Sequence, residues 1–212
     1  MKHWMLAGHT SQIPDTGNYF LVEFDTESII VVRTQDGPIK AHMNVCRHRG
    51  SHICLEKQGT IKALACPYHA WTYDLDGELK AARNMSDDFE FQDNNLHPVT
   101  VELVGGLIFI SLAENPPSLN GMREDLKDVF DVFGFDNMKL AEHRHYPIQA
   151  NWKLVVENYQ ECYHCAPSHK DFAKIHAMAQ SPEKFDAQKE AFIKKSDGYV
   201  RTKASSYYFD MA

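Results

Sequence analysis

Cys46-Arg47-His48 and, after seventeen intervening residues, Cys66-Pro67-Tyr68-His69 are the stretches that decide how this sequence is read. Each stretch offers one thiol and one imidazole within a short loop. A two-iron, two-sulfide cluster held by two Cys on one iron and two His on the other needs this set of ligands. Neutral imidazoles in place of two thiolates make such a cluster less negative and raise its reduction potential above that of an all-Cys cluster.

A zinc site and coincidental burial both fit these residues less well. A structural zinc ion also takes two Cys and two His, but zinc motifs usually pair Cys with Cys and His with His at their own spacings. Here each half-site mixes the two residue types. If the cysteines were buried only by coincidence, four potential ligand residues would have matched the motif spacing by chance.

The residues around the two stretches read as strands and strengthen the resemblance to a known motif. Residues 60–65 lead into the second loop, and Trp71 opens another strand after it. The sequence of the two loops resembles the Rieske motif, and the second loop has the Cys-Pro-Tyr-His-Ala-Trp form found in Rieske oxygenases. Respiratory-type Rieske proteins carry an additional Cys in each loop, which form a disulfide, and Tyr68 occupies one of those places here. The resemblance is therefore to the ferredoxin and oxygenase branch.

Composition narrows the class of protein. At 212 residues the chain can bury one good core or two modest ones. The longest apolar run, near 107–110, is too short to span a membrane, and the first residues lack a signal peptide's apolar segment. A net charge of -7 argues against a nucleic-acid surface. The cysteines outside the motif predict free thiols in a reducing cytoplasm: Cys54, Cys162 and Cys165.

Residues 1–113 are predicted to form an all-β unit of many short strands. Asp76-Gly77 is a hairpin signal, and Asn115-Pro116-Pro117 marks a domain boundary. The expected strands cover residues 4–7, 19–25, 28–33, 39–45, 60–65, 71–75, 78–81, 99–103 and 107–112.

The hydrophobic period changes after residue 118. A helix is expected over 119–133, where Gly134 can stop it, followed by a strand over 140–149. A second helix is expected over 151–165, ended by Pro167. The sequence further indicates a short helix over 171–179 and a strand beginning at 205.

A second constellation lies in the 157–169 segment. Glu161 and His164 share a helical face, and His169 follows Pro167, where the chain can bend back. Two His and one carboxylate are the facial triad of non-haem Fe(II) oxygenases, which leaves coordination sites for O₂. On its own this spacing is a weak signal. Its position about a hundred residues after a Rieske motif makes ligand roles for these residues the preferred interpretation. Cys162-x-x-Cys165 alone would suggest a redox dithiol.

Both constellations together resemble the catalytic (alpha) subunit of Rieske non-haem iron oxygenases. The resemblance implies an all-β Rieske domain, an antiparallel sandwich with two cluster-binding loops, over residues 1–113. It also implies that residues 114–212 are the start of an α+β helix-grip catalytic domain. In that family head-to-tail trimers carry electrons from one subunit's cluster to its neighbour's iron through a bridging carboxylate.

The resemblance also assigns the individual residues. It makes Cys46, His48, Cys66 and His69 the [2Fe-2S] ligands. It makes His164 and His169 ligands of the mononuclear Fe(II), and Glu161 the bridge between subunits, with Cys162 and Cys165 as packing residues.

Two departures from the family pattern carry information. Most such oxygenases have Asp at the bridge, and Glu161 within its motif resembles oxygenases of quaternary ammonium compounds such as glycine betaine and carnitine. The family's third iron ligand is an Asp well over a hundred residues after the second His, so we expect it beyond Ala212 and expect this chain to be an inactive fragment. None of the acids after His169 has a matching context: Asp171, Asp186, Asp197 and Asp210.

The sequence thus predicts the oxygenase component of a monooxygenase that uses O₂ and electrons from NAD(P)H. The expected partners are a flavin/iron–sulfur reductase, two further copies in a homotrimer and a small-molecule substrate, with no nucleic acid and no membrane. One alternative is an aromatic-ring-hydroxylating dioxygenase alpha subunit. Another is a pure electron-transfer Rieske protein, which would have no need for the 157–169 segment.

Overall fold

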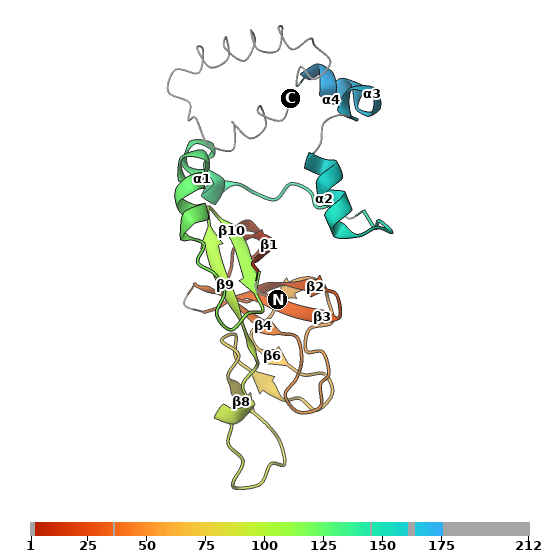
Figure 1. The fold of residues 1–212 in the computed structure, drawn as a ribbon. Helices are drawn as coiled ribbons and strands as arrows, with labels where there is room; N and C mark the ends of the chain where they lie inside the picture. Colours follow the sequence, from red (N-terminus) through yellow and green to blue (C-terminus); the bar gives the residue numbers. More distant parts are fainter. Residues whose placement is uncertain (1–2, 36, 145, 161–163, 176–212) are drawn as a thin grey trace. The chain divides into compact units, whose positions relative to one another are not determined.

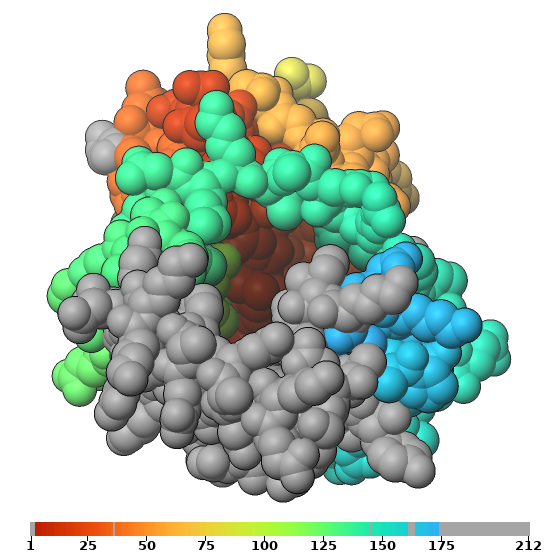
Figure 2. Space-filling model, turned by 90° about the horizontal axis from the view of Figure 1, so that it is seen from above, coloured from red at the N-terminus to blue at the C-terminus, as the bar shows by residue number. Residues whose placement is uncertain are grey.

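The computed structural model describes residues 3–35, 37–144, 146–160 and 164–175; the remaining residues are grey in Figure 1 and in Figure 2. The described chain forms two compact units, one ending at Glu142 and one beginning at His143. No helix of the described residues is long and apolar enough to cross a membrane.

Antiparallel strands build the first unit, as the sequence predicts. A seven-stranded sheet has the order β1-β10-β9-β4-β3-β2-β5, and a three-stranded sheet has the order β6-β7-β8. The strands are β1 (Met5–His9), β2 (Asn18–Phe24), β3 (Glu27–Arg33), β4 (Ile39–Met43), β5 (Gln58–Thr60), β6 (Leu64–Ala65), β7 (Thr72–Tyr73), β8 (Leu79–Ala81), β9 (Pro98–Val104) and β10 (Leu107–Ser111). Single 3-10 turns occur at η1 (Thr10–Gln12), η2 (Gln92–Asn94) and η3 (Phe135–Asn137).

Strand β3 lies between two hydrophobic cores. Because side chains alternate between the faces of a strand, Ile29 and Val31 point into one core, and Ile30 and Val32 into the other. All four side chains are fully buried. The second of these cores also contains Cys46 and Cys66, so the main sheet packs directly beneath the two loops of the motif.

The expected strand over 60–65 is wrong as a single element. Residues 58–60 form β5 and pair with β2, whereas residues 64–65 form β6 and pair with β7 in the other sheet. The chain leaves the first sheet where the Ile61 N–H donates to the carbonyl of Gly17 at 2.9 Å. Hydrophobicity marks both pieces as strand, but only the pairing partners separate them.

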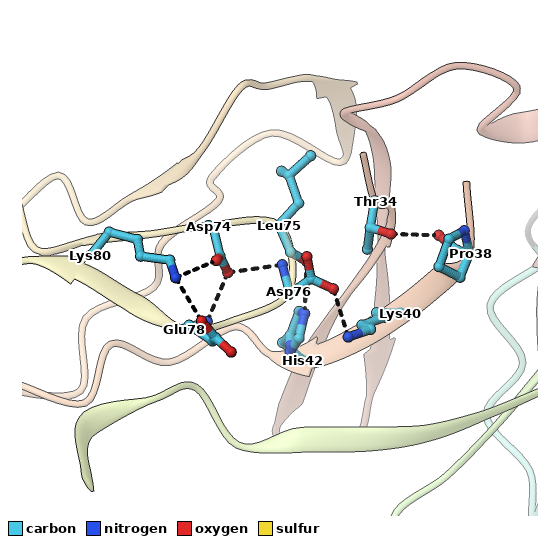
Figure 3. A network of polar contacts seen from close by, with 9 residues as sticks. All are labelled: Thr34, Pro38, Lys40, His42, Asp74, Leu75, Asp76, Glu78 and Lys80. Atoms are coloured by element: carbon cyan, nitrogen blue, oxygen red, sulfur yellow. Dashed lines mark hydrogen bonds and ion pairs between the residues drawn. The ribbon is translucent and has the colours of Figure 1, made fainter. Parts of the chain in front are cut away.

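Polar contacts attach the β7–β8 hairpin to β4 (Figure 3). The buried His42 ring lies 3.1 Å through Nε2 from the carbonyl of Leu75, and Lys40 forms an ion pair with Asp76 at 2.6 Å. The Asp74 carboxylate accepts the backbone N–H groups of Asp76 and Glu78 and so closes the hairpin turn. Gly77 makes this close approach possible, because a Cβ there would lie 2.6 Å from Cε1 of His42.

Helix α1 (Asn120–Phe133) follows β10 and lies near the β9–β10 turn (Figure 1). Arg123 pairs with Glu102 of β9 at 2.9 Å, and the Phe130 ring lies against Gly105 in the turn. Gly134 ends the helix in the left-handed conformation at φ 61°, which confirms the expected stop. The proposed boundary after residue 113 stays a prediction.

The described residues of the second unit contain three helices. They are α2 (Trp152–Gln160), α3 (Cys165–Ser168) and α4 (Lys170–Ile175). The strand expected over 140–149 is wrong, because its described residues are in no sheet. A strand needs a neighbouring strand to pair with, and among the described residues no strand pairs with this segment. The helix expected over 151–165 is described only as far as Gln160, and Pro167 lies in the first turn of α3.

Candidate metal centre

The two loops of the motif have the same backbone design. In the first, the Gly50 N–H donates to the carbonyl of Cys46 at 2.9 Å, and the Cys46 N–H donates to that of Ser51 at 2.8 Å. In the second, the N–H of Ala70 donates to the carbonyl of Cys66 at 3.0 Å, and the Cys66 N–H donates to that of Trp71 at 2.8 Å. Each loop therefore closes four and five residues after its Cys.

The closing residue of each loop has a positive φ, 74° at Gly50 and 59° at Ala70. Gly adopts this conformation readily, whereas an L-residue such as Ala70 incurs about 1–2 kcal/mol. Ala70 keeps that strained conformation in a loop held by two backbone hydrogen bonds, and strain of this kind gathers at functional sites.

The fold sorts the four expected ligands into like pairs. The Cys46 and Cys66 thiols are both buried in the same core, close enough for Cys66 to raise the pKa of Cys46. The rings of His48 and His69 meet edge to face, with centroids 4.6 Å apart. The sequence places one Cys and one His in each loop, but the structure brings thiol to thiol and imidazole to imidazole.

The first loop's imidazole is prepared to bind a metal. The Nδ1 atom of His48 is buried and has no hydrogen-bond partner among the described residues. Burial, then the neighbouring His69 and Arg49, lower the pKa of His48, which favours the neutral ring that metals bind. His69 is exposed, so the imidazole pair lies at the surface end of the site.

The thiol pair lies deeper and meets a hydroxyl. Burial raises the pKa of the Cys46 thiol, so a metal must displace its proton. Tyr73, which is fully buried, places its Oη 3.4 Å from Cys46 Sγ and accepts the N–H of Arg47 at 3.1 Å. Burial also raises the pKa of Tyr73 well above its usual value, which keeps the hydroxyl protonated as a donor to a cysteine thiolate.

This arrangement fits a two-iron cluster better than a single zinc ion. A structural zinc site usually takes Cys–Cys and His–His pairs at their own spacings along the chain, whereas here each loop supplies one Cys and one His. Two separated pairs, one of sulfur and one of nitrogen, instead suit two irons with different ligands. Cys46, His48, Cys66 and His69 would hold that cluster.

Sequence reasoning missed two side chains of this centre. Tyr73 contacts Cys46, and the Trp71 ring stacks on His48, with centroids 4.8 Å apart and planes 8° from parallel. From the sequence, Trp71 is expected only as the start of a strand. The available signal was the place of both residues directly after the second loop, on a strand that must face the ligands.

The second constellation is only partly described. The His164 and His169 rings lie with centroids 5.3 Å apart, nearly perpendicular at 78°. The turn between them is held by the His169 N–H, which donates to the carbonyl of Cys165 at 2.8 Å. Cys165 is buried, and Asp171 in α4 is exposed. The other expected residues of this region lie outside the described residues: Glu161, Cys162, Asp186, Asp197 and Asp210.

Two family models match this chain in succession. The Rieske [2Fe-2S] domain matches residues 3–101, and the catalytic domain of the ring-hydroxylating alpha subunit matches residues 135–211. The glycine betaine monooxygenase oxygenase subunit of Pseudomonas aeruginosa is 42% identical over 174 residues, which are 82% of this chain and 41% of that relative.

Solved structures agree with the family models. A quaternary ammonium Rieske monooxygenase, described for carnitine oxidation and inter-subunit electron transfer, matches with a TM-score of 0.73 and 33% identity over 81% of this chain and 48% of its own. Naphthalene 1,2-dioxygenase from Rhodococcus sp. matches with a TM-score of 0.71 and 32% identity over 82% and 42%. The chain thus spans less than half the length of these relatives.

Proposed function

Because this chain belongs to the family of Rieske-type ring-hydroxylating oxygenase alpha subunits, we propose that it is part of an oxygenase component that hydroxylates a quaternary ammonium compound. The observation that carries the proposal is the sorting of Cys46 with Cys66 and of His48 with His69. It supports a [2Fe-2S] centre, while the paired His164 and His169 rings support a second iron.

The residues of the first site have separate tasks in this proposal. A bound cluster would supply one-electron transfer, and a mononuclear iron would supply reactivity toward O₂. Cys46 and Cys66 would hold one iron, and the Tyr73 hydroxyl, 3.4 Å from Cys46 Sγ, would donate to that sulfur. His48 and His69 would hold the other iron, and the exposed His69 would be the ligand within reach of a redox partner.

The second site is the less complete part of the proposal. His164 and His169 bind the catalytic iron, and Glu161 bridges to the cluster of a neighbouring subunit. In the described ranges no third His, Cys, Asp or Glu joins these two imidazoles at one point. We propose an Asp beyond Ala212 as the third ligand, in keeping with the family's pattern.

The substrate class rests on the identities of the relatives. An N-methyl group of glycine betaine or carnitine, with O₂, two electrons and two protons, would give an N-hydroxymethyl cation and water. That cation then releases formaldehyde and a proton and leaves a tertiary amine. Because the positive nitrogen has no proton to donate, we expect aromatic faces rather than hydrogen-bond acceptors in the pocket.

The remaining assignments follow from the same proposal. A flavin/iron–sulfur NAD(P)H reductase supplies electrons, three copies form a ring, and the protein works in the cytoplasm. The trimer is supported by the relative described with inter-subunit electron transfer. The cytoplasm is supported by Cys54, which is a free thiol outside the cluster motif.

One alternative keeps the same architecture. The similarity to naphthalene 1,2-dioxygenase favours aromatic-ring dihydroxylation as the second candidate. An electron carrier without oxygenase activity is disfavoured, because it would not need the His164–His169 pair.

The test uses the full-length protein with an NADH-dependent reductase. We expect formaldehyde in a 1:1 ratio to NADH consumed with glycine betaine, carnitine or stachydrine. Hydroxylation of naphthalene or an aromatic acid, with these three substrates inert, would give the dioxygenase alternative instead. Iron content separates the electron carrier, which binds two irons per chain rather than three.

A further inference from the structure

Trp71 takes part in both cluster loops. Its carbonyl accepts the N–H of Cys66 and thereby closes the second loop, while its indole lies on the His48 ring of the first. We propose that Trp71 is a positioning residue, which ties the two loops together and sets the orientation of the His48 imidazole. This inference rests on the proposed [2Fe-2S] centre.

The geometry of the stack leaves His48 little freedom. The two rings are 8° from parallel with centroids 4.8 Å apart, while the His69 ring meets His48 edge-on. Rotation of the imidazole out of this plane would break the stack and turn Nδ1 away from its buried position. The direction of the Nδ1 lone pair toward a metal is therefore coupled to the indole plane.

Trp71 is itself firmly held. It is only 3% exposed and belongs to the core that contains Cys46 and Cys66. Phe89 meets the indole edge to face with centroids 5.5 Å apart, and Phe91 meets Phe89 in the same way at 5.3 Å. Ring contacts thus connect His48 through Trp71 to Phe89 and Phe91 in the loop between β8 and β9. These contacts hold the indole plane on which the His48 ring stacks.

Within the described chain, no disulfide joins the two loops. Cys46, Cys54 and Cys66 are free thiols, and the backbone hydrogen bonds of each loop close that loop on itself. The side chain of Trp71 reaches from the second loop to the first. Edge and face contacts between aromatic rings are favourable beyond the area they bury, so this contact takes the place of a covalent cross-link.

The stack also has an electrostatic consequence. Taking up an electron makes a cluster with two thiolates more negative, and an apolar indole face disfavours that charge compared with water. Removal of the ring therefore lets water approach His48 and stabilises the reduced state. The reduction potential should shift to a more positive value, and the ring orientation of His48 should become heterogeneous.

The test compares three variants of the 212-residue chain after iron–sulfide reconstitution. Trp71→Leu keeps an apolar side chain without a ring, and Trp71→Phe keeps a smaller ring. Leu96→Ala is the matched control, because Leu96 is 4% exposed in the same core but is not part of the stack. The readouts are the midpoint potential, the nitrogen couplings of the two His ligands by pulsed EPR, and the rate of iron loss to a chelator.

We expect Trp71→Leu to shift the potential upward, to broaden one of the two nitrogen couplings and to lose iron roughly three- to tenfold faster. Trp71→Phe should show smaller changes in the same direction. Leu96→Ala should lower the melting temperature but leave the potential and both couplings at the wild-type values. This pattern separates positioning of His48 from general loosening of the core.

Three results would overturn the inference. The first is a wild-type potential with wild-type couplings in Trp71→Leu. The second is an equal shift in Leu96→Ala. If Trp71→Leu holds no iron, Trp71→Phe decides, and wild-type spectra with a wild-type rate of iron loss in that variant count against the stack. A wild-type chain without a Rieske EPR signal would instead remove the proposed centre itself, and the inference with it.

Discussion

The cluster loops and the 157–169 segment carry the same kinds of metal ligand, but their surroundings differ. Next to the loops, Trp71 is 3% exposed and Tyr73 is fully buried. In α2, Trp152 is 68% exposed and Tyr159 is 78% exposed. The first site has its own core within the described chain, whereas the apolar side chains of α2 are exposed among the described residues.

The comparison shows two ways to build a metal site. In the loops, short hydrogen bonds and a local core fix the ligands before any metal arrives. In the second segment, one turn closed by the His169 N–H and the Cys165 carbonyl brings His164 and His169 together. We therefore expect the first site to be rigid and the second to depend on further packing.

The largest expected effect is the complete loss of the cluster on removal of one thiol. Cys46→Ser and Cys66→Ser should abolish the Rieske EPR signal, because each removes one of the two proposed thiolate ligands of the cluster. His164→Ala should leave the signal unchanged, since it belongs to the other region. A signal that survives Cys66→Ser, or disappears in His164→Ala, would contradict the separation of the two sites.

Hydrogen exchange should distinguish the regions by a wide margin. Amides of β3 lie between two buried cores, so they should exchange on the order of a thousandfold more slowly than those of α2. Mass spectrometry of peptides from residues 27–33 and 152–160 measures this ratio in one sample. Equal protection of the two peptides would show that α2 is as well packed as the sheet.

Gly77→Ala should destabilise the first unit by about 2–4 kcal/mol. The new Cβ would lie 2.6 Å from Cε1 of His42, at a backbone φ of 89°. Gly37→Ala is the matched control, because Gly37 also has a positive φ of 95° but nothing lies within 4 Å of its added Cβ. It should cost about 1 kcal/mol, from the backbone conformation alone. Equal losses in urea unfolding would mean that His42 moves away easily.

The smallest expected effect is a pH dependence that arises from His42. Burial lowers the pKa of His42, and Lys40 adds to that effect, while the Leu75 carbonyl, Asp76 and Asp74 oppose it. The Nδ1 atom is buried with no partner in the described chain, so a proton there would have no acceptor.

Since the folded pKa lies below the unfolded one, the unfolded chain takes up the proton first as the pH falls. The stability from neutral His42 is therefore complete above pH ~6.5 and declines as the pH falls toward the folded pKa. His42→Gln should flatten the fall in melting temperature between about pH 7 and pH 5. An unchanged slope in this variant would assign the acid sensitivity to other groups.

Local patterns in the sequence were sufficient for most of the elements. Short runs of apolar residues predict β2, β3, β9 and β10 to within one or two residues, and Gly134 ends α1 where expected. Those features depend on neighbours along the chain, which a sequence displays. The strand expected over 140–149 failed, because a strand depends on a partner segment that local hydrophobicity does not reveal.

The sequence by itself predicts the metal ligands as Cys46, His48, Cys66 and His69, followed by His164 and His169. Only the tertiary structure decided that thiol meets thiol and imidazole meets imidazole, and that Trp71 lies on His48. Residue types and spacing limit the chemistry of each loop. The pairing across the loops depends on how each loop is placed against the other. Backbone hydrogen bonds close each loop, β6 pairs with β7 on either side of the second loop, and packing against β3 brings residues of both loops into one core.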